Sequence, residues 1–348
     1  MKILKFFIFC SFCYITNLWA DSGNVWQKEL PYMIDYIEKN ENLIMVAAGK
    51  NFYILEKDSG NIILEKKLNC NVISGITPIF NNILLSNYCG KIMMINKEGE
   101  ILYEKEYDQG LTKALNCGGY IFVQCRNNKL YCLYANNLEK KDFFESGNVN
   151  YCLEPFCASD KILIYQGFDK KGYAKTYFFD IPEGKIKFKK DFGFLKKPIL
   201  FEDKIIFLSG LKKHLLILMD FGGNILKKIN LNQEIISFYK NNNNLFILSK
   251  KGISIYSKDL NLIKKVKFSI KKIPLNKNSV LFDNYILSAN LKNIFIYNYV
   301  KDKIKKISLS LKKDETQPFS VKIYYYGSDF IIATYKNYLY CFNIDMVW

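Results

Sequence analysis

The stretch NFYILEKDSGNIILEKKL at residues 51–68 decides the fold, because its pattern returns along the chain. It consists of an apolar strand, a turn that contains glycine, and a second strand in which apolar and charged residues alternate. Residues 91–107, KIMMINKEGEILYEKEY, have the same form. An eighth copy begins at residue 337 and lacks its last strand. The remaining copies lie at residues 129–144, 175–192, 214–231, 252–268 and 293–309.

The spacing of these copies predicts the class of repeat. Landmark residues at equivalent places in successive copies are 40, 38, 46, 39, 38, 41 and 45 positions apart. In several copies a further pair of apolar strands, joined by Asn, Gly or Asp, precedes the landmark. Four strands in each period of about 40 residues, without helical periodicity, are typical of a β-propeller. The landmarks are Tyr53, Met93, Tyr131, Tyr177, Leu216, Ser254, Phe295 and Tyr340.

The start of the chain supplies the strand that the eighth copy lacks. Residues 21–30, DSGNVWQKEL, match DSGNIILEKKL at residues 58–68, with Trp26 near the place of Leu64. Pairing the two chain ends closes the ring and covers a strand edge that would otherwise invite aggregation. We therefore predict an all-β fold, an eight-bladed β-propeller whose last blade is closed by the N-terminal strand, with residues 21–348 as one domain.

The first twenty residues predict export. Lys2 and Lys5 precede an apolar run at residues 6–14, and cleavage is expected after Ala20. We interpret residues 1–20 as a signal peptide, with an uncleaved N-terminal anchor as the alternative. No later stretch contains the roughly 18 apolar residues that a membrane-spanning helix needs.

Basic residues dominate the charge. The formal net charge is +17, and Arg126 is the only arginine, so almost all of the positive charge comes from lysines spread through the repeats. Codon bias explains such a composition, and a basic surface for an acidic partner or anionic lipid is the sharper alternative. Nucleic-acid binding would favour arginine and clustered basic stripes, so we expect no nucleic-acid partner.

Of the ten cysteines, Cys10 and Cys13 fall in the predicted signal peptide. Phe9 and Phe12 precede them, where a lipoprotein cleavage site needs a small residue, so the sequence disfavours a lipid anchor. Eight cysteines remain, an even number that permits disulfides in an exported protein. Several lie within strands, where a thiol packs as a small apolar side chain, so we favour mostly core thiols and leave any pairing open.

The repeat resembles the PQQ-like propeller repeat, most clearly at residues 77–107 and 21–30, although its Trp remains only at Trp26. At this length and predicted blade number, the chain is similar to the BamB-type outer-membrane assembly factors. That resemblance implies a periplasmic, monomeric scaffold of a Gram-negative cell. It also implies binding to the POTRA domains of the barrel-inserting subunit. The missing lipoprotein cleavage site departs from the pattern of that family, so we expect at most peripheral contact with the outer membrane. The resemblance transfers no contact residues.

An enzyme is not expected. Quinone-dependent dehydrogenases share the repeat but use a Trp beneath the cofactor, adjacent cysteines and calcium ligands, whereas the mature chain has only Trp26 and Trp348 and no adjacent cysteines. His214 is the sole histidine, and no Gly-x-Ser-x-Gly motif accompanies it. We predict no catalytic residues, no cofactor and no metal. The alternative function is an exported propeller that binds a small molecule or quinone, with redox activity.

One insertion offers a candidate contact. Residues 167–173, GFDKKGY, lengthen a hairpin in the fourth copy. Phe168 and Tyr173 are our partner-binding candidates, since loops on a rigid scaffold often carry function. A tolerated insertion without a role is the alternative.

Overall fold

The computed structural model describes most of the chain beyond the predicted signal peptide at residues 1–20, which lies outside the described residues. Within the described ranges, no helix is long and apolar enough to cross a membrane. Those ranges are residues 24–40, 42–68, 73–107, 109–125, 129–145, 155–168, 171, 173–210, 214–267, 273–276, 279–290, 293–308, 322–325, 330–335 and 338–343.

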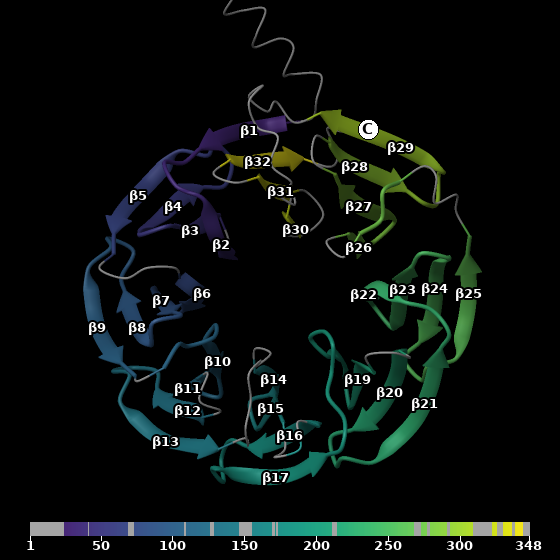
Figure 1. Ribbon diagram of the computed structural model, residues 1–348, viewed down its shortest axis with the longest axis horizontal. Helices are drawn as coiled ribbons and strands as arrows, with labels where there is room; N and C mark the ends of the chain where they lie inside the picture. The colour runs from purple at the N-terminus through teal and green to yellow at the C-terminus, as the bar shows by residue number, and fades with distance from the viewer. Residues whose placement is uncertain are drawn as a thin grey trace, which may run out of the picture.

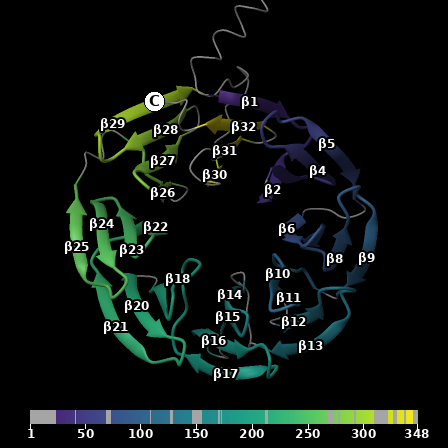
Figure 2. The same ribbon diagram turned by 180° about the vertical axis from the view of Figure 1, so that it is seen from behind.

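The described strands form eight four-stranded sheets, arranged around a ring as the blades of a β-propeller (Figures 1 and 2). The predicted all-β propeller is confirmed. We number the blades from the one that contains β2. Blade 1 contains β2 (Ile34–Asn40), β3 (Leu43–Ala48), β4 (Asn51–Glu56) and β5 (Ile62–Lys67). Blade 2 contains β6 (Ile73–Ile79), β7 (Asn82–Asn87), β8 (Lys91–Ile95) and β9 (Ile101–Glu106). Blade 3 contains β10 (Leu115–Cys117), β11 (Tyr120–Gln124), β12 (Lys129–Tyr134) and β13 (Lys140–Glu145).

The next blades repeat this order. Blade 4 contains β14 (Phe156–Ser159), β15 (Ile162–Phe168), β16 (Ala174–Asp180) and β17 (Lys185–Lys190). Blade 5 contains β18 (Ile199–Phe201), β19 (Lys204–Ser209), β20 (His214–Asp220) and β21 (Ile225–Leu231). Blade 6 contains β22 (Ile235–Asn241), β23 (Asn244–Ser249), β24 (Gly252–Ser257) and β25 (Leu262–Val266). Blade 7 contains β26 (Val280–Phe282), β27 (Tyr285–Ala289), β28 (Asn293–Asn298) and β29 (Lys303–Ser308). The eighth sheet contains β30 (Lys322–Tyr325), β31 (Phe330–Tyr335), β32 (Tyr338–Asn343) and β1 (Asn24–Glu29).

Burial follows the position of a strand within its blade. In blade 1 all residues of β3 but the first are buried, and so are all residues of β4 but the last. Every residue of β9, a fourth strand, is exposed. The middle strands are apolar because they pack between neighbouring blades, and the fourth strands carry charge because they meet solvent. All eight landmark residues of the repeat lie on third strands, as their common pattern predicts.

The two ends of the chain meet in the eighth sheet (Figure 1). β1 pairs antiparallel with β32, from Asn24 opposite Phe342 to Glu29 opposite Tyr338. One core cluster contains Trp26 together with Leu339 and residues of blade 1. The N-terminal strand therefore closes the last blade, as the match between residues 21–30 and 58–68 predicts.

Of the contacts between neighbouring blades, which we call seams, two share one arrangement. Trp26 of β1 is 8% exposed, and its Nε1 donates a hydrogen bond of 2.7 Å to the Lys57 carbonyl oxygen of blade 1. Its ring covers Gly60, where an added Cβ would lie 2.6 Å from the indole. Leu64 covers Gly99 in the same way at the next seam, at 3.0 Å. Both glycines have positive φ, at 68° and 82°, so the turn and the close contact both favour glycine.

The described cysteines are of two kinds. Cys125, Cys132 and Cys341 are buried free thiols, and Cys89 is an exposed one. Burial raises the pKa of Cys132 to about 11 and that of Cys341 to about 12, so both stay protonated and unreactive. Cys117 is disulfide-bonded, which answers in part the question of pairing that the sequence leaves open. Cys70 and Cys152 lie outside the described residues.

Each blade presents its turns at two ends of the ring. Consecutive strands are antiparallel, so the turn between strands one and two and the turn between strands three and four lie at the same end. We call this end the hairpin face. The turn between strands two and three and the connection to the next blade lie at the opposite end, the connection face.

Candidate partner-binding site

A cleft of about 620 Å³ lies between blades 2 and 3 on the hairpin face. Three turns line it: the turn that joins β6 to β7, the turn that joins β10 to β11, and the turn that joins β12 to β13. Met94 of β8 and Ile79 of β6 add apolar surface. The repeat thus brings three hairpin turns from two blades to one place.

Phe80 has an unusual backbone conformation and exposure for an aromatic residue of this cleft. Its side chain is 80% exposed, and its φ is 49°. In the equivalent turns of blades 3, 6 and 7 the residue is Gly118, Asn242 or Asp283, with φ of 58°, 50° and 41°. These residue types tolerate positive φ, whereas a bulky side chain costs about 1–2 kcal/mol there. An exposed aromatic ring in a strained turn adds nothing to the core, and such an outlier points to function.

Two tyrosines and a lysine border the cleft beside Phe80. The rings of Tyr120 and Tyr134 lie 5.8 Å apart between centroids, and Tyr134 is 41% exposed. Lys141 Nζ lies 3.9 Å from the centroid of the Tyr120 ring. A hydrogen bond to Tyr120 raises the pKa of Lys141, which keeps the ammonium charged at the edge of the cleft.

This arrangement suits the binding of a protein side chain. Exposed aromatic rings around an apolar floor are the side chains that dominate protein interfaces, and the lysine adds a charge for orientation. The polar contact within the floor is a weak hydrogen bond of 3.7 Å that Asn82 donates to Met94 Sδ. Across the described part of the chain, no three His, Cys, Asp or Glu side chains are grouped to hold a metal ion.

The candidates chosen from the sequence lie elsewhere. Phe168 ends β15 and pairs with Ala174 of β16, so the insertion does lengthen this hairpin of blade 4. Tyr173 is 66% exposed, while the side chain of Phe168 lies outside the described residues. The hairpin joins second and third strands and therefore lies on the connection face. The structure does not bring Phe168 or Tyr173 to the cleft.

His214 begins β20 and takes part in a seam. Its Nδ1 accepts a hydrogen bond of 2.9 Å from the Ile235 backbone amide, which links blade 5 to blade 6. Burial lowers the pKa of His214, Lys196 lowers it further, and Glu234 opposes them. The neutral imidazole is therefore favoured, and its observed contact is structural.

The sequence contained one sign of the cleft that the repeat pattern alone does not reveal. Phe80 occupies the hairpin turn that Gly118, Asn242 and Asp283 occupy in other copies. Comparing this turn with those of blades 3, 6 and 7 would have singled it out, because a turn former occupies the place of Phe80 in each of them. The tyrosines carry no such sign, since aromatic residues occur in strands throughout the chain.

The ring of four-stranded sheets defines the chain as a β-propeller with a candidate protein-binding face. No family model and no curated protein matches its sequence. Among solved structures it is similar to BamB from Moraxella catarrhalis, with 12% identity and a TM-score of 0.68, over 92% of this chain and 99% of that chain. It is also similar to the computationally designed protein Ika8, with 8% identity and a TM-score of 0.66, over 91% of this chain and 98% of that one. A natural protein and a designed one match almost equally well, so these likenesses establish the fold alone.

Proposed function

We propose that this chain is a non-catalytic scaffold in the assembly of outer-membrane β-barrel proteins, where it binds the POTRA domains of the barrel-inserting subunit. The observation that carries the proposal is the likeness to BamB over nearly the full length of both chains. The signal-peptide pattern at residues 1–20 is in keeping with a periplasmic location, peripheral to the outer membrane.

The cleft between blades 2 and 3 is the proposed docking site. Phe80 projects from the hairpin face as an anchor for a partner pocket, and Tyr120 and Tyr134 offer a surface for an apolar side chain of the partner. Phe80 lies in a tight turn and the two tyrosines are paired strand ends, so binding orders little of the chain and loses little entropy.

The first test is capture of the partner. The mature protein is immobilised and incubated with envelope extract of its own organism, and retained proteins are identified by mass spectrometry. We expect enrichment of the barrel-inserting subunit, and weaker enrichment by Phe80→Asn. Retention of other proteins without that subunit contradicts the proposed role.

The choice of Asn at position 80 separates binding from folding. Asn242 occupies the equivalent turn in blade 6 with nearly the same φ, so Phe80→Asn relieves strain and leaves stability equal or higher. Tyr173→Ala is the matched control, because it removes an exposed aromatic ring from the connection face.

A further inference from the structure

The charge on the rim of the ring is divided between two halves. The fourth strands of blades 4 to 7 are β17 (KIKFKK), β21 (ILKKINL), β25 (LIKKV) and β29 (KIKKIS). They carry four, two, two and three lysines, eleven in all, and no carboxylate. We call these four strands the lysine arc. The other outer strands, β1, β5, β9 and β13, carry six lysines and six carboxylates.

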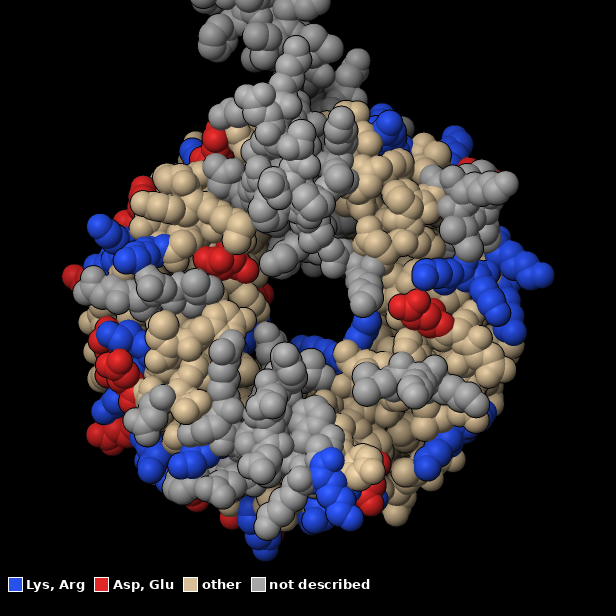
Figure 3. Space-filling model, viewed as in Figure 1, with Lys and Arg blue, Asp and Glu red and all other residues tan. Residues whose placement is uncertain are grey.

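The lysine arc is continuous, because its four strands belong to successive blades (Figure 1). Eight of its eleven lysines are exposed and three are half-buried. Figure 3 shows the contrast: basic side chains gather on the rim beside β25, whereas acidic and basic side chains alternate beside β9. Lysines occur throughout the repeats as predicted, but carboxylates within the fourth strands occur only in the other half of the ring.

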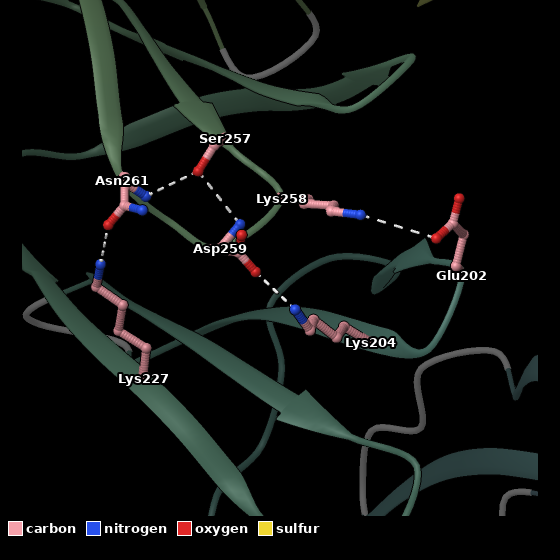
Figure 4. Close-up of polar contacts among 7 residues, drawn as sticks. All are labelled: Glu202, Lys204, Lys227, Ser257, Lys258, Asp259 and Asn261. Atoms are coloured by element: carbon pink, nitrogen blue, oxygen red, sulfur yellow. Dashed lines mark hydrogen bonds and ion pairs between the residues drawn. The ribbon is translucent and has the colours of Figure 1, made fainter.

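The carboxylates beside the arc pair chiefly with lysines outside it, and Asp259 also interacts electrostatically with Lys227 of the arc. Asp259 accepts a hydrogen bond of 2.6 Å from Lys204 of β19, and Glu202 lies 3.8 Å from Lys258 (Figure 4). Neither of these lysines belongs to the arc. Lys227 of the arc donates to the neutral side chain of Asn261, at 2.7 Å.

One arc lysine does have an acidic partner. Lys185 forms an ion pair of 2.7 Å with Glu183, in which both side chains are more than half exposed. An ion pair so open to solvent holds its partner weakly. The arc therefore presents a largely uncompensated positive surface.

Exposed aliphatic side chains accompany these lysines. Ile225 and Leu226 begin β21, and Leu262 and Ile263 begin β25, with exposed fractions between 39% and 57%. The balanced half of the rim has similar pairs, such as Ile62 and Ile63. The two halves therefore differ in charge more than in apolar surface, which makes the balanced half an internal control.

The composition of the arc favours a lipid surface over a protein. Protein interfaces are enriched in Tyr, Trp and Arg and depleted in Lys, and the four strands contain none of the first three. Nucleic-acid sites also rely on arginine and on stacking aromatic rings. Lysines near an anionic membrane attract it without specific geometry, and aliphatic side chains at its interface strengthen the contact.

We propose that the lysine arc binds the surface of an anionic lipid bilayer, with the ring standing on its rim. Because the bilayer surface is flat and the rim is convex, only a few blades can touch the bilayer at once. We therefore expect β21 and β25, at the centre of the arc, to lie closest to the lipid. This inference is independent of the proposed scaffold function, because it concerns the rim and not the cleft.

The test is co-sedimentation of the mature protein with vesicles of phosphatidylglycerol and phosphatidylcholine, or of phosphatidylcholine alone. We expect binding to the anionic vesicles only, weakening as salt is added. The arc variant K227E/K228E/K264E/K265E is compared with the control K66E/K67E/K105E/K140E, which changes the net charge equally on the balanced half. We expect the arc variant to lose roughly a hundredfold or more in binding, and the control to lose less than about threefold.

Melting curves of both variants check that the ring is intact, and replacement of the same lysines by Gln serves if the Glu variants do not fold. Equal losses in the arc and control variants would mean that net charge alone is responsible, and the proposal fails. It fails too if the wild-type protein ignores anionic vesicles at low salt. If the protein binds immobilised polyglutamate but not anionic vesicles, the proposal fails, and the partner of the arc is an acidic protein instead.

Discussion

Two seams of the ring use the same geometry with different side chains. Where β1 meets blade 1, Trp26 covers Gly60 and donates a hydrogen bond to the Lys57 carbonyl oxygen. Where blade 1 meets blade 2, the half-buried Leu64 covers Gly99. The larger side chain and the added hydrogen bond lie at the strand that joins the two chain ends. The closing strand thus has a stronger contact than a strand held by its own hairpin.

The largest effect is expected from removing the closing strand. Deletion of residues 25–30 takes away Trp26 and most of the pairing with β32, and exposes the edge of β32. We expect a loss of about 5 kcal/mol or more in unfolding free energy, together with self-association through the open edge. Calorimetry and size-exclusion chromatography measure the two effects. An unchanged melting temperature in a monomeric deletion variant contradicts the closure model.

Single truncations compare the two seams directly. Trp26→Ala should cost about 3–5 kcal/mol, because it empties a buried site and leaves the Lys57 carbonyl without its donor. Leu64→Ala should cost about 1–2 kcal/mol, since Leu64 is only partly buried. Ile63→Ala, on the same strand but largely exposed, serves as the control. Urea unfolding gives all three values, and equal costs for Trp26 and Leu64 would remove the distinction between the seams.

The glycines beneath these side chains give a smaller and graded effect. Gly60→Ala should cost about 2–3 kcal/mol and Gly99→Ala about 1–2 kcal/mol, because an added Cβ lies closer to Trp26 than to Leu64. Gly119→Ala isolates the cost of positive φ, since its φ is 79° and an added Cβ meets nothing within 4 Å. The same unfolding experiment applies. A cost at Gly119 as large as at Gly60 shows that backbone strain, and not the seam contact, decides the result.

The smallest effect concerns pH at the seam between blades 5 and 6. The pKa of His214 is lowered in the folded protein, chiefly by burial, so the unfolded chain binds the proton more readily. His214 therefore contributes stability that is complete above its ordinary pKa of about 6.5 and is lost as the pH falls below that value. His214→Asn keeps an acceptor for the Ile235 amide and should flatten this decline in melting curves between pH 7 and pH 5, about the range in which histidine titrates. An unaltered pH profile in the variant refutes the role given to His214.

Much of the fold follows from the sequence because it is written in local pattern. Strand alternation repeats along the copies and a turn glycine returns in several of them, and the match between residues 21–30 and 58–68 indicates how the ring closes. The match also places Trp26 near the position of Leu64, whereas its contact with Gly60 emerges only from the structure. The features that the sequence does show are properties of single strands or turns, and the periodic pattern of apolar and charged residues is enough to predict them.

The candidate site required the assembled ring. Phe80 lies in a turn of blade 2, whereas Tyr120 and Tyr134 lie at strand ends of blade 3, and no spacing in the sequence shows that their side chains share a cleft. Insertion length drew attention instead to Phe168 and Tyr173, which lie on the opposite face. The division of charge on the rim likewise emerges only after the fourth strands are located, because residues of the intervening strands separate them in the sequence.

The central claim is that the cleft on the hairpin face binds the POTRA domains of the barrel-inserting subunit. Titration of purified POTRA domains against the wild-type protein, Phe80→Asn and Tyr173→Ala, at low and at physiological salt, tests it most directly. The account predicts measurable binding by the wild-type protein, a dissociation constant raised roughly tenfold or more by Phe80→Asn, and no change with Tyr173→Ala. Absence of binding at low salt, or equal binding by wild type and Phe80→Asn, would contradict it.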